Sequence, residues 1–300
     1  MDVAITGSSG LIGTALTASL RSRGHRPISL VRRAVQPGED AIEWIPSANH
    51  IDAASLEGVG GVVHLAGAGI GDKRWSDDYK RELLGSRAGP TRLLATTLAG
   101  LNRPPGVLVS GSGITYYGNR GSERLTESSG PGDLFLSELC VQWEAATQPA
   151  VDAGIRVAVV RSGLVLSRAG GALAKLLPLF KLGLGGPFGS GKQWWSWISI
   201  DDEVGAMQWL LENDVAGAVN LTAPTAVTNA EFAKTLGRVL HRPTFLPIPA
   251  FGPRLLRGTQ LANELLFASQ RVVPEALTEA GYRFAHPDLD RALAAVLERA

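Results

Sequence analysis

The feature that most constrains this chain is a run of glycines close to its start. Residues 6–13 read Thr-Gly-Ser-Ser-Gly-Leu-Ile-Gly and separate a short β-rich run from an amphipathic helical pattern. In that context Gly7 permits a tight turn, Gly10 lets a pyrophosphate approach the backbone, and Gly13 lets the helix pack on the sheet. We therefore expect a dinucleotide to bind at the start of the helix, the alternative being a glycine turn without a ligand. The expected contacts are Gly7, Ser9, Gly10, Leu11, Ile12 and Gly13.

The end of the second expected strand bears on the choice of cofactor. Folds that select NAD place Asp or Glu there to bind the ribose 2′-hydroxyl. Here Arg32 and Arg33 follow the strand. A guanidinium can bind a 2′-phosphate through two charge-assisted hydrogen bonds. The sequence thus favours NADP(H) over NAD(H), with solvated surface charge as the alternative for both arginines.

Short β-rich runs alternate with helical patterns through the first half of the chain. This alternation predicts a doubly wound, Rossmann-like α/β sheet with parallel strands and helices on both faces. The expected strands are 3–5, 27–31, 42–44, 62–65, 106–110 and 156–160, and the expected helices are 11–23, 77–98 and 134–152.

The second half has a different character. Residues 163–191 are rich in Gly and Pro, and Trp194, Trp195 and Trp197 follow them. We expect a Rossmann domain over residues 1–165 that receives later strands, and a small C-terminal substrate lobe over residues 166–300. Further elements are expected as helices at 202–213 and 288–299, a strand at 219–221 and a helix capped by Asn229.

Charge and cysteine content exclude several classes of function. The chain has 29 basic and 28 acidic residues, so it offers no general attraction for nucleic acid or an anionic membrane. A single cysteine, Cys140, forms no internal disulfide, and the histidines lack metal-ligand spacing, so no metal is assigned. No leader pattern or spanning apolar run is visible, and we expect a cytoplasmic protein.

Several motifs together resemble one family. Besides the glycine turn, the shared segments are His64-Leu65-Ala66-Gly67, Arg74-Trp75, Ser86-Arg87, Tyr116-Tyr117-Gly118, Trp143-Glu144, 161–166, 182–187, 197–202, 229–233 and 270–274. With them the chain resembles an extended, atypical short-chain dehydrogenase/reductase of the NAD-dependent epimerase/dehydratase superfamily. The likeness is to its nucleoside-diphosphate-sugar epimerase-like branch, which has its own C-terminal domain.

The resemblance implies roles for individual residues. Leu65, Ala66 and Gly67 would lie along the cofactor, and Val165 would pack near the nicotinamide. Glu82 and Arg87 would face the cofactor pocket, with an exposed helical carboxylate as the alternative for Glu82. Ser112 would replace the active-site Ser or Thr that hydrogen-bonds a substrate oxygen.

The chain departs from the superfamily at its usual Tyr-x-x-x-Lys pair. Phe135 or Leu136 stands in place of the Tyr, and Leu139 or Cys140 in place of the Lys. The phenols of Tyr116 and Tyr117 are the replacements we consider for proton transfer, with packing of their loop as the alternative. Cys140 is expected to be inert core and Glu138 a solvated helix residue.

The leading hypothesis is an NADP(H)-dependent oxidoreductase or epimerase that acts on a small polar substrate, with a nucleotide sugar suggested by analogy alone. The long segment 185–195, which carries Lys192, would be its binding loop. The alternative is an NADP(H)-binding sensor or scaffold with little or no turnover. A homodimer through the helix at 134–144 is a further expectation.

Overall fold

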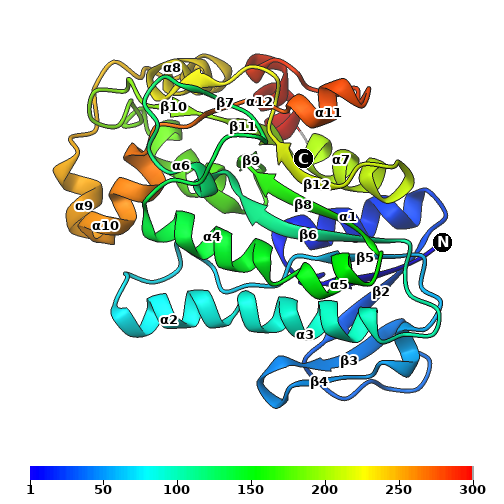
Figure 1. Cartoon of the computed structure of the whole chain (residues 1–300). Helices are drawn as coiled ribbons and strands as arrows, with labels where there is room; N and C mark the ends of the chain where they lie inside the picture. Colours follow the sequence, from blue (N-terminus) through cyan, green and yellow to red (C-terminus); the bar gives the residue numbers. More distant parts are fainter. Residues whose placement is uncertain (299–300) are drawn as a thin grey trace.

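The computed structural model describes residues 1–298, and its centre is an eight-stranded sheet (Figure 1). The strand order is β12-β8-β6-β5-β1-β2-β3-β4, and all neighbours are parallel except the antiparallel pair β3 and β4. The doubly wound α/β prediction is confirmed. The strands are β1 (Asp2–Thr6), β2 (Arg26–Val31), β3 (Ala41–Ile45), β4 (His50–Ile51), β5 (Gly61–His64), β6 (Val107–Gly113), β8 (Arg156–Ser162) and β12 (Gly217–Leu221).

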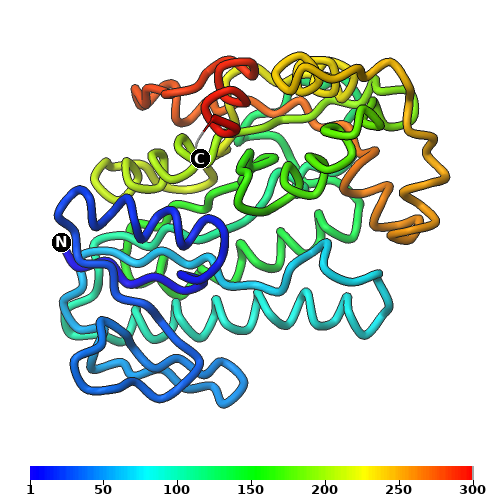
Figure 2. Tube along the Cα trace, turned by 180° about the vertical axis from the view of Figure 1, so that it is seen from behind, coloured from blue at the N-terminus to red at the C-terminus, as the bar shows by residue number. Residues whose placement is uncertain are grey.

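Helices cover both faces of the sheet. On one face α1 (Leu11–Ser22) and α7 (Ile200–Glu212) lie side by side (Figure 2). On the other lie α3 (Ala88–Ala99), α4 (Phe135–Ala145) and α5 (Gln148–Asp152). Side chains of β1 alternate between two apolar clusters: Val3 and Ile5 pack toward α1 and α7, whereas Ala4 packs toward α3. Because both clusters are buried, the strand reads as a continuous apolar run.

Two helices that the sequence predicted as continuous are each broken. The expected helix 77–98 consists of α2 (Asp77–Gly85) and α3, and the expected helix 134–152 consists of α4 and α5. Proline explains both breaks. Pro90 and Pro149 lie in the first turn of α3 and α5, where the missing N–H costs no helical hydrogen bond.

The second half returns β12 to the sheet and α7 to its face, so the Rossmann unit includes residues 200–221 as well as most of 1–165. The rest forms a smaller lobe around its own apolar cluster, with Trp197 fully buried in it. Its elements are β9 (Leu164–Leu166), α6 (Gly171–Lys181), β10 (Trp194–Trp195), β11 (Trp197–Ser199), β13 (Val227–Thr228), α8 (Asn229–Leu240), α9 (Phe251–Arg257), α10 (Thr259–Ala262), a π-helical turn (Asn263–Phe267), β14 (Arg271–Val272), α11 (Glu275–Glu279) and α12 (Leu289–Glu298). β7 (Arg124–Leu125) pairs with β14, and 3-10 turns lie at Pro46–Ala48, Ala54–Leu56 and Ile114–Tyr117.

Three details of this lobe differ from expectation. Helix α6 lies inside the Gly- and Pro-rich segment 163–191, for which no helix was expected. The cap of α8 is Thr228, whose hydroxyl accepts from the Glu231 backbone while the Glu231 carboxylate accepts in return. Asn229 instead accepts a hydrogen bond from the Phe188 backbone. The expected end of the last helix, Arg299, lies outside the described residues, and within 1–298 no helix is long and apolar enough to cross a membrane.

Candidate functional site

The glycine turn connects β1 to α1 in a shape that only glycine can adopt. Gly7 has a φ of 69°, and a Cβ there would lie 2.9 Å from the backbone carbon of Leu65. A Cβ on Gly13 would lie 2.2 Å from the carbonyl oxygen of Gly7. Both distances are far below a normal van der Waals contact, so these two positions fix the close approach of turn, helix and β5.

The first turn of α1 is free to bind an anion. Gly10 occupies the N-cap position and brings no side chain to cap the helix, and no acidic residue lies in the first turn. The N–H groups at a helix start carry partial positive charge and need acceptors. A pyrophosphate would satisfy them, so the turn has the geometry and the charge that a dinucleotide requires.

Thr6 holds the neighbouring loop against the turn. Its Oγ1 accepts hydrogen bonds from the backbone N–H groups of Leu65 (3.0 Å) and Ala66 (3.1 Å). His64 Nδ1 lies 2.8 Å from the same oxygen, and His64 Nε2 lies 2.8 Å from Thr91 Oγ1. The hydroxyl proton of Thr6 therefore points to Nδ1, and the imidazole N–H points to Thr91.

His64 is completely buried in this arrangement. Burial, with a smaller effect of the Arg87 charge, lowers its pKa to about 4, so the ring is neutral at physiological pH. Sequence reasoning noted His64 only as part of a motif. The hydroxyls that face it come from β1 and α3, far apart in the chain, and no local pattern signals that contact.

The two arginines after β2 differ in their contacts. Arg33 Nη1 lies 2.8 Å from Glu39 Oε2, and both side chains are largely exposed. Arg32 is exposed, and its guanidinium has no partner within residues 1–298. Arg32 is thus available for a ligand, whereas Arg33 would have to exchange its partner.

Arg87 and Glu82 lie in different surroundings. Arg87 is buried at the junction of α2 and α3, where Nη2 donates to the carbonyl of Ala68 at 2.8 Å and the guanidinium stacks on Trp143. A Cβ on Gly67 would lie 3.0 Å from that guanidinium carbon, so Arg87 supports the loop that follows β5. Glu82 is exposed and lies 3.1 Å from Lys73 Nζ, a position that favours a surface role.

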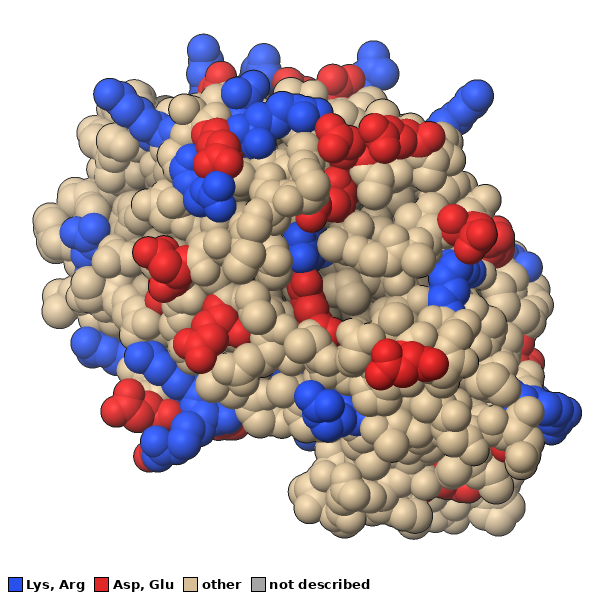
Figure 3. Space-filling model, viewed as in Figure 1, with Lys and Arg blue, Asp and Glu red and all other residues tan. Residues whose placement is uncertain are grey.

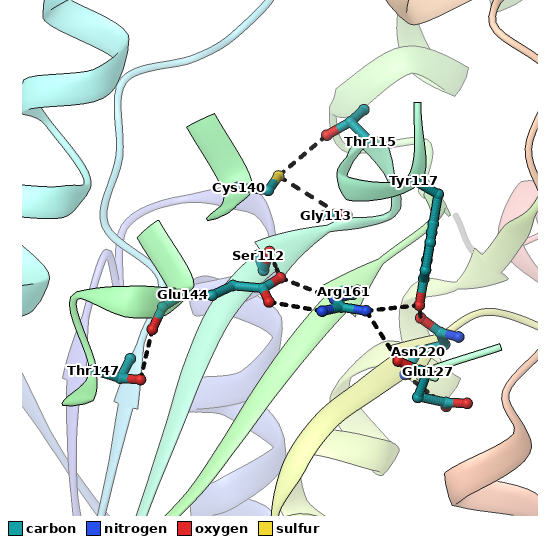
Figure 4. A network of polar contacts seen from close by, with 10 residues as sticks. All are labelled: Ser112, Gly113, Thr115, Tyr117, Glu127, Cys140, Glu144, Thr147, Arg161 and Asn220. Atoms are coloured by element: carbon teal, nitrogen blue, oxygen red, sulfur yellow. Dashed lines mark hydrogen bonds and ion pairs between the residues drawn. The ribbon is translucent and has the colours of Figure 1, made fainter. Parts of the chain in front are cut away.

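A buried polar network joins the carboxyl ends of three neighbouring strands, β6, β8 and the edge strand β12 (Figure 4). Ser112, on β6, donates to Glu144 Oε1 of α4 at 2.7 Å. Arg161, on β8, donates to both oxygens of Glu144, at 2.9 and 2.8 Å. Arg161 Nη1 donates to the hydroxyl of Tyr117 at 3.0 Å, and that hydroxyl donates to Asn220 Oδ1 at 2.7 Å. Every polar group in this chain of contacts has a partner.

Two of the three residues predicted to be catalytic, Ser112 and Tyr117, belong to this network. Ser112 is nearly buried and already bound to Glu144. Tyr117 is fully buried, and burial raises the pKa of its phenol. Tyr116 is half-buried, with the Arg161 guanidinium 3.4 Å from its ring centre. These positions favour packing for both tyrosines over contact with a substrate.

The segment that replaces the usual Tyr and Lys is apolar in the structure too. Phe135 packs edge-on against Trp75, and Leu136 is buried. Cys140 is buried beside Thr115 and the carbonyl of Gly113, and burial raises the pKa of its thiol. A thiol of this kind is a poor nucleophile at neutral pH. The residues that replace the pair therefore supply no acid or base here.

A cavity of about 630 Å³ opens at the carboxyl ends of β6 and β8, where open α/β sheets bind their ligands. Ile114, Thr115, Ser162 and Leu164 line it from the sheet, and α6, α9 and the 188–196 segment close it. Gly171, also in the wall, lies against Leu11 of the glycine turn and near the carbonyl of Val165, so the cavity adjoins the dinucleotide turn. Lys192 is exposed and is not part of the cavity wall.

The hydroxyl of Ser162, in the cavity wall, is hydrogen-bonded to the buried carboxyl group of Glu203, which the sequence analysis did not identify. Ser162 donates to Glu203 Oε1 at 2.5 Å, and Glu203 is completely buried. Burial raises the pKa of Glu203 to about 8, and its Oε2 has no hydrogen-bond partner within the described chain. The run Asp201-Asp202-Glu203 reads as ordinary acidic residues at a helix start, which hides this contact.

Comparison with known proteins agrees with this geometry. A model of the "NAD dependent epimerase/dehydratase family" matches residues 3–222, and one described as "Domain of unknown function (DUF1731)" matches residues 248–296. The human "Epimerase family protein SDR39U1" is 41% identical over 98% of both chains. "Epimerase family protein MT2273" of Mycobacterium tuberculosis is 44% identical over 97% of this chain and 96% of its own.

Solved structures show the same relationship. A crystal structure of human SDR39U1 with NADPH superimposes with a TM-score of 0.91 at 40% identity and covers both chains completely. The nucleoside-diphosphate sugar epimerase from Corynebacterium glutamicum gives a TM-score of 0.82 at 39% identity, over 99% of this chain and 58% of that one. Together with the glycine turn, these matches show that the chain belongs to the NAD-dependent epimerase/dehydratase family.

Proposed function

We propose that this protein is an NADP(H)-dependent enzyme of the oxidoreductase or epimerase type. The observation that carries the proposal is the turn at Gly7 and Gly13, where any Cβ would collide with backbone and where the helix start lacks an internal cap. A glycine turn that opens onto uncapped N–H groups of a helix start is suited to bind a pyrophosphate. The similar human protein was solved with NADPH, which supports the same cofactor here.

Arg32 is the residue we assign to the 2′-phosphate of NADP(H). It is exposed, follows β2 and has no partner within residues 1–298, whereas the adjacent Arg33 binds Glu39. Titration calorimetry of Arg32→Ala should show NADPH affinity reduced by about 10-fold or more, because a charge-assisted hydrogen bond contributes roughly 1.5–3 kcal/mol. NADH affinity should stay unchanged.

Arg33→Ala is the matched control for that titration, since it removes the same charge one residue away. We expect it to weaken NADPH binding less than Arg32→Ala. Equal NADPH affinity in the unmodified protein and in Arg32→Ala would reject the 2′-phosphate assignment and leave both arginines as surface charge.

The hydroxyls that line the cavity are the groups best placed to meet a substrate. A bound nicotinamide would supply hydride transfer, and the protein would supply a proton donor or acceptor. Thr115 and Ser162 lie in the cavity wall, whereas the described wall includes neither Ser112 nor Tyr117. We therefore assign substrate contact to Ser162, which Glu203 backs, ahead of Ser112, Tyr116 and Tyr117.

The second candidate function, a cofactor-binding sensor or scaffold, is favoured by one observation. Apolar Phe135, Leu136 and buried Cys140 replace the Tyr and Lys that carry proton transfer in the superfamily. Loss of NADPH absorbance in a screen of carbonyl compounds detects net reduction by an oxidoreductase. Chromatographic separation of product epimers detects an epimerase, which returns the hydride to its substrate and leaves the cofactor unchanged. Turnover in either assay that Ser162→Ala reduces supports an enzyme; cofactor binding without turnover in both assays supports the sensor. The homodimer through α4 stays a prediction, which a light-scattering mass tests.

A further inference from the structure

The cavity beside the dinucleotide turn differs from a site for a sugar nucleotide. We propose that it binds an amphiphile, a ligand with an apolar chain and an anionic head group. This inference rests on the proposed function, because it names the substrate class of the same site. It replaces the small polar substrate that the sequence suggested.

The inner wall is built from apolar side chains. Leu176 and Leu179 enter from α6, Phe188 and Trp195 from the segment before β11, and Leu265 and Leu266 from the π-helical turn. A volume of about 630 Å³ is that of a site for a whole small molecule, not a packing defect. Apolar surface of this extent is stabilised by contact with an apolar ligand.

The hydroxyl groups of the wall are engaged with the protein, and Gln270 Nε2 is a buried donor of the wall without a partner in the described chain. Ser196 donates to the carbonyl of Gln270, Ser162 donates to Glu203, and Thr115 contacts Cys140. A diphosphate and several sugar hydroxyls would need many free partners, since each buried polar group left unpaired costs roughly 1–3 kcal/mol. The wall offers a hydrocarbon chain better complementarity than a nucleotide sugar.

The mouth of the cavity is marked by residues that line the wall and also face solvent. Leu179 on α6 is 42% exposed and Leu256 on α9 is 79% exposed, so the opening lies between these two helices. Arg257 follows Leu256, lies in the same wall, is exposed and has no partner within residues 1–298. Lys175, one turn before Leu179, brings a second cation, 3.8 Å from Asp72. Arg257 and Lys175 could therefore bind an anionic head group at the mouth while the apolar chain of the same ligand lies inside the cavity.

The surface around the mouth is apolar as well. Among residues 1–298, eight of the eleven large exposed hydrophobic side chains fall between residues 179 and 184 or between 245 and 256. Figure 3 shows few charged side chains on the flank over α9 and α10. Exposed hydrophobic residues without a function are usually scattered singly over a surface. Their concentration near the mouth indicates a path by which an apolar ligand reaches the cavity.

The test is a fluorescence titration with cis-parinarate, a fatty acid whose emission rises in apolar surroundings, and with its methyl ester, which lacks the charge. We expect saturable binding with one site per chain. Gly252→Phe should weaken it at least about 10-fold, because Gly252 lies in the wall and a Cβ there meets no atom within 4 Å, so the ring would take up open space beside the wall without displacing protein atoms.

Two control pairs locate the binding. Gly89 is an exposed residue of α3, and a Cβ there also meets no atom within 4 Å. Gly89→Phe should therefore leave parinarate affinity unchanged. Arg257→Ala should weaken the acid several-fold and spare the methyl ester, whereas Arg291→Ala, on α12, should change neither. Circular dichroism checks that each variant is folded.

The proposal is overturned if parinarate does not bind, if Gly252→Phe binds it as well as the unmodified protein does, or if UDP-glucose displaces it. Binding that survives Gly252→Phe would be adsorption to the apolar flank. A parallel NADPH titration keeps the two claims apart: NADPH binding without parinarate binding rejects only the amphiphile, and absent NADPH binding rejects the proposed function.

Discussion

The two sides of the crevice at the sheet's carboxyl edge are built in different ways. The dinucleotide side consists of backbone: the turn at Gly7, the helix start at Gly10 and the loop that Thr6 holds through two N–H groups. The cavity side consists of side chains from α6, α9 and the π-helical turn. A backbone site leaves a short, spaced signature in the sequence, whereas a side-chain site assembled from distant segments leaves none. The first side therefore identifies the family, and the second determines what this member binds.

The largest effect is expected from adding a side chain to the glycine turn, because the dinucleotide side of the crevice is built from backbone. Gly13→Ala puts a Cβ 2.2 Å from the carbonyl oxygen of Gly7, so the turn must shift. We expect NADPH affinity to fall at least about 100-fold in titration calorimetry, the equivalent of two factors of roughly 1.4 kcal/mol. Gly89→Ala is the matched helical control, since its Cβ meets nothing within 4 Å, and it should leave affinity intact. Equal losses in both variants would show that the effect is not specific to the turn.

The buried network around Arg161 lies on neither side. Substitutions in it should lower the free energy of unfolding and leave cofactor affinity unchanged. Glu144→Ala leaves Arg161, which is 4% exposed, without its carboxylate partner. Breaking a buried pair in this way costs roughly 3–5 kcal/mol of unfolding free energy. Urea unfolding measures the loss. A change below about 1 kcal/mol would mean that water replaces the carboxylate and that the buried pair contributes little to stability.

Glu203 gives the cavity side a pH dependence. In the unfolded chain a glutamate ionises near 4.5, whereas in the folded protein burial raises the pKa of Glu203 to about 8. Between these values the unfolded state has released a proton that the folded state retains. Its contribution to stability is therefore present below 4.5 and is lost as pH rises toward 8, by up to about 1.4 kcal/mol per pH unit.

Glu203→Gln removes this titration while keeping an acceptor for the Ser162 hydroxyl. The variant should gain stability relative to the unmodified protein as pH rises from 5 to 8, measured by urea unfolding at each pH. A difference that does not change with pH would contradict a carboxyl that is protonated in the folded protein. Glu279→Gln, at the exposed end of α11, is the control and should show no such trend.

The smallest effects separate the two neighbouring tyrosines. Tyr117→Phe removes a hydroxyl that bonds Arg161 and Asn220, and we expect a loss of roughly 1–3 kcal/mol in unfolding free energy with NADPH affinity unchanged. Tyr116→Phe should stay within about 0.5 kcal/mol, because no hydrogen bond of its hydroxyl joins it to the described residues. If Tyr116→Phe instead abolishes turnover at unchanged stability, Tyr116 is the proton donor and our assignment to Ser162 is wrong.

Much of the fold could be predicted because its signals are local. The strands around β1 read as short apolar runs, and the glycine spacing predicted the first turn; the structure confirms both. The breaks at Pro90 and Pro149 were missed because the helical periodicity continues across them. Helix α6 was missed because glycines flank it and Pro178 lies inside it, although its apolar face closes the cavity.

The candidate site was harder to predict, since its side chains interact across distant segments. The family resemblance suggested Ser112, and its place after the expected strand 106–110 suggested Tyr117, but only the fold shows that Glu144 and Arg161 engage them. The Ser162–Glu203 contact joins residues 41 positions apart, and no spacing rule indicates it. The apolar lining likewise depends on how α6 and α9 meet above the sheet.

The central claim is that the turn at the start of α1 binds NADP(H), and titration calorimetry of the unmodified protein with NADPH and NADH tests it most directly. We predict binding of one NADPH per chain, with NADPH preferred over NADH by a margin that Arg32→Ala removes. If neither dinucleotide binds, the glycine turn is architecture without its ligand, and the proposed function is wrong.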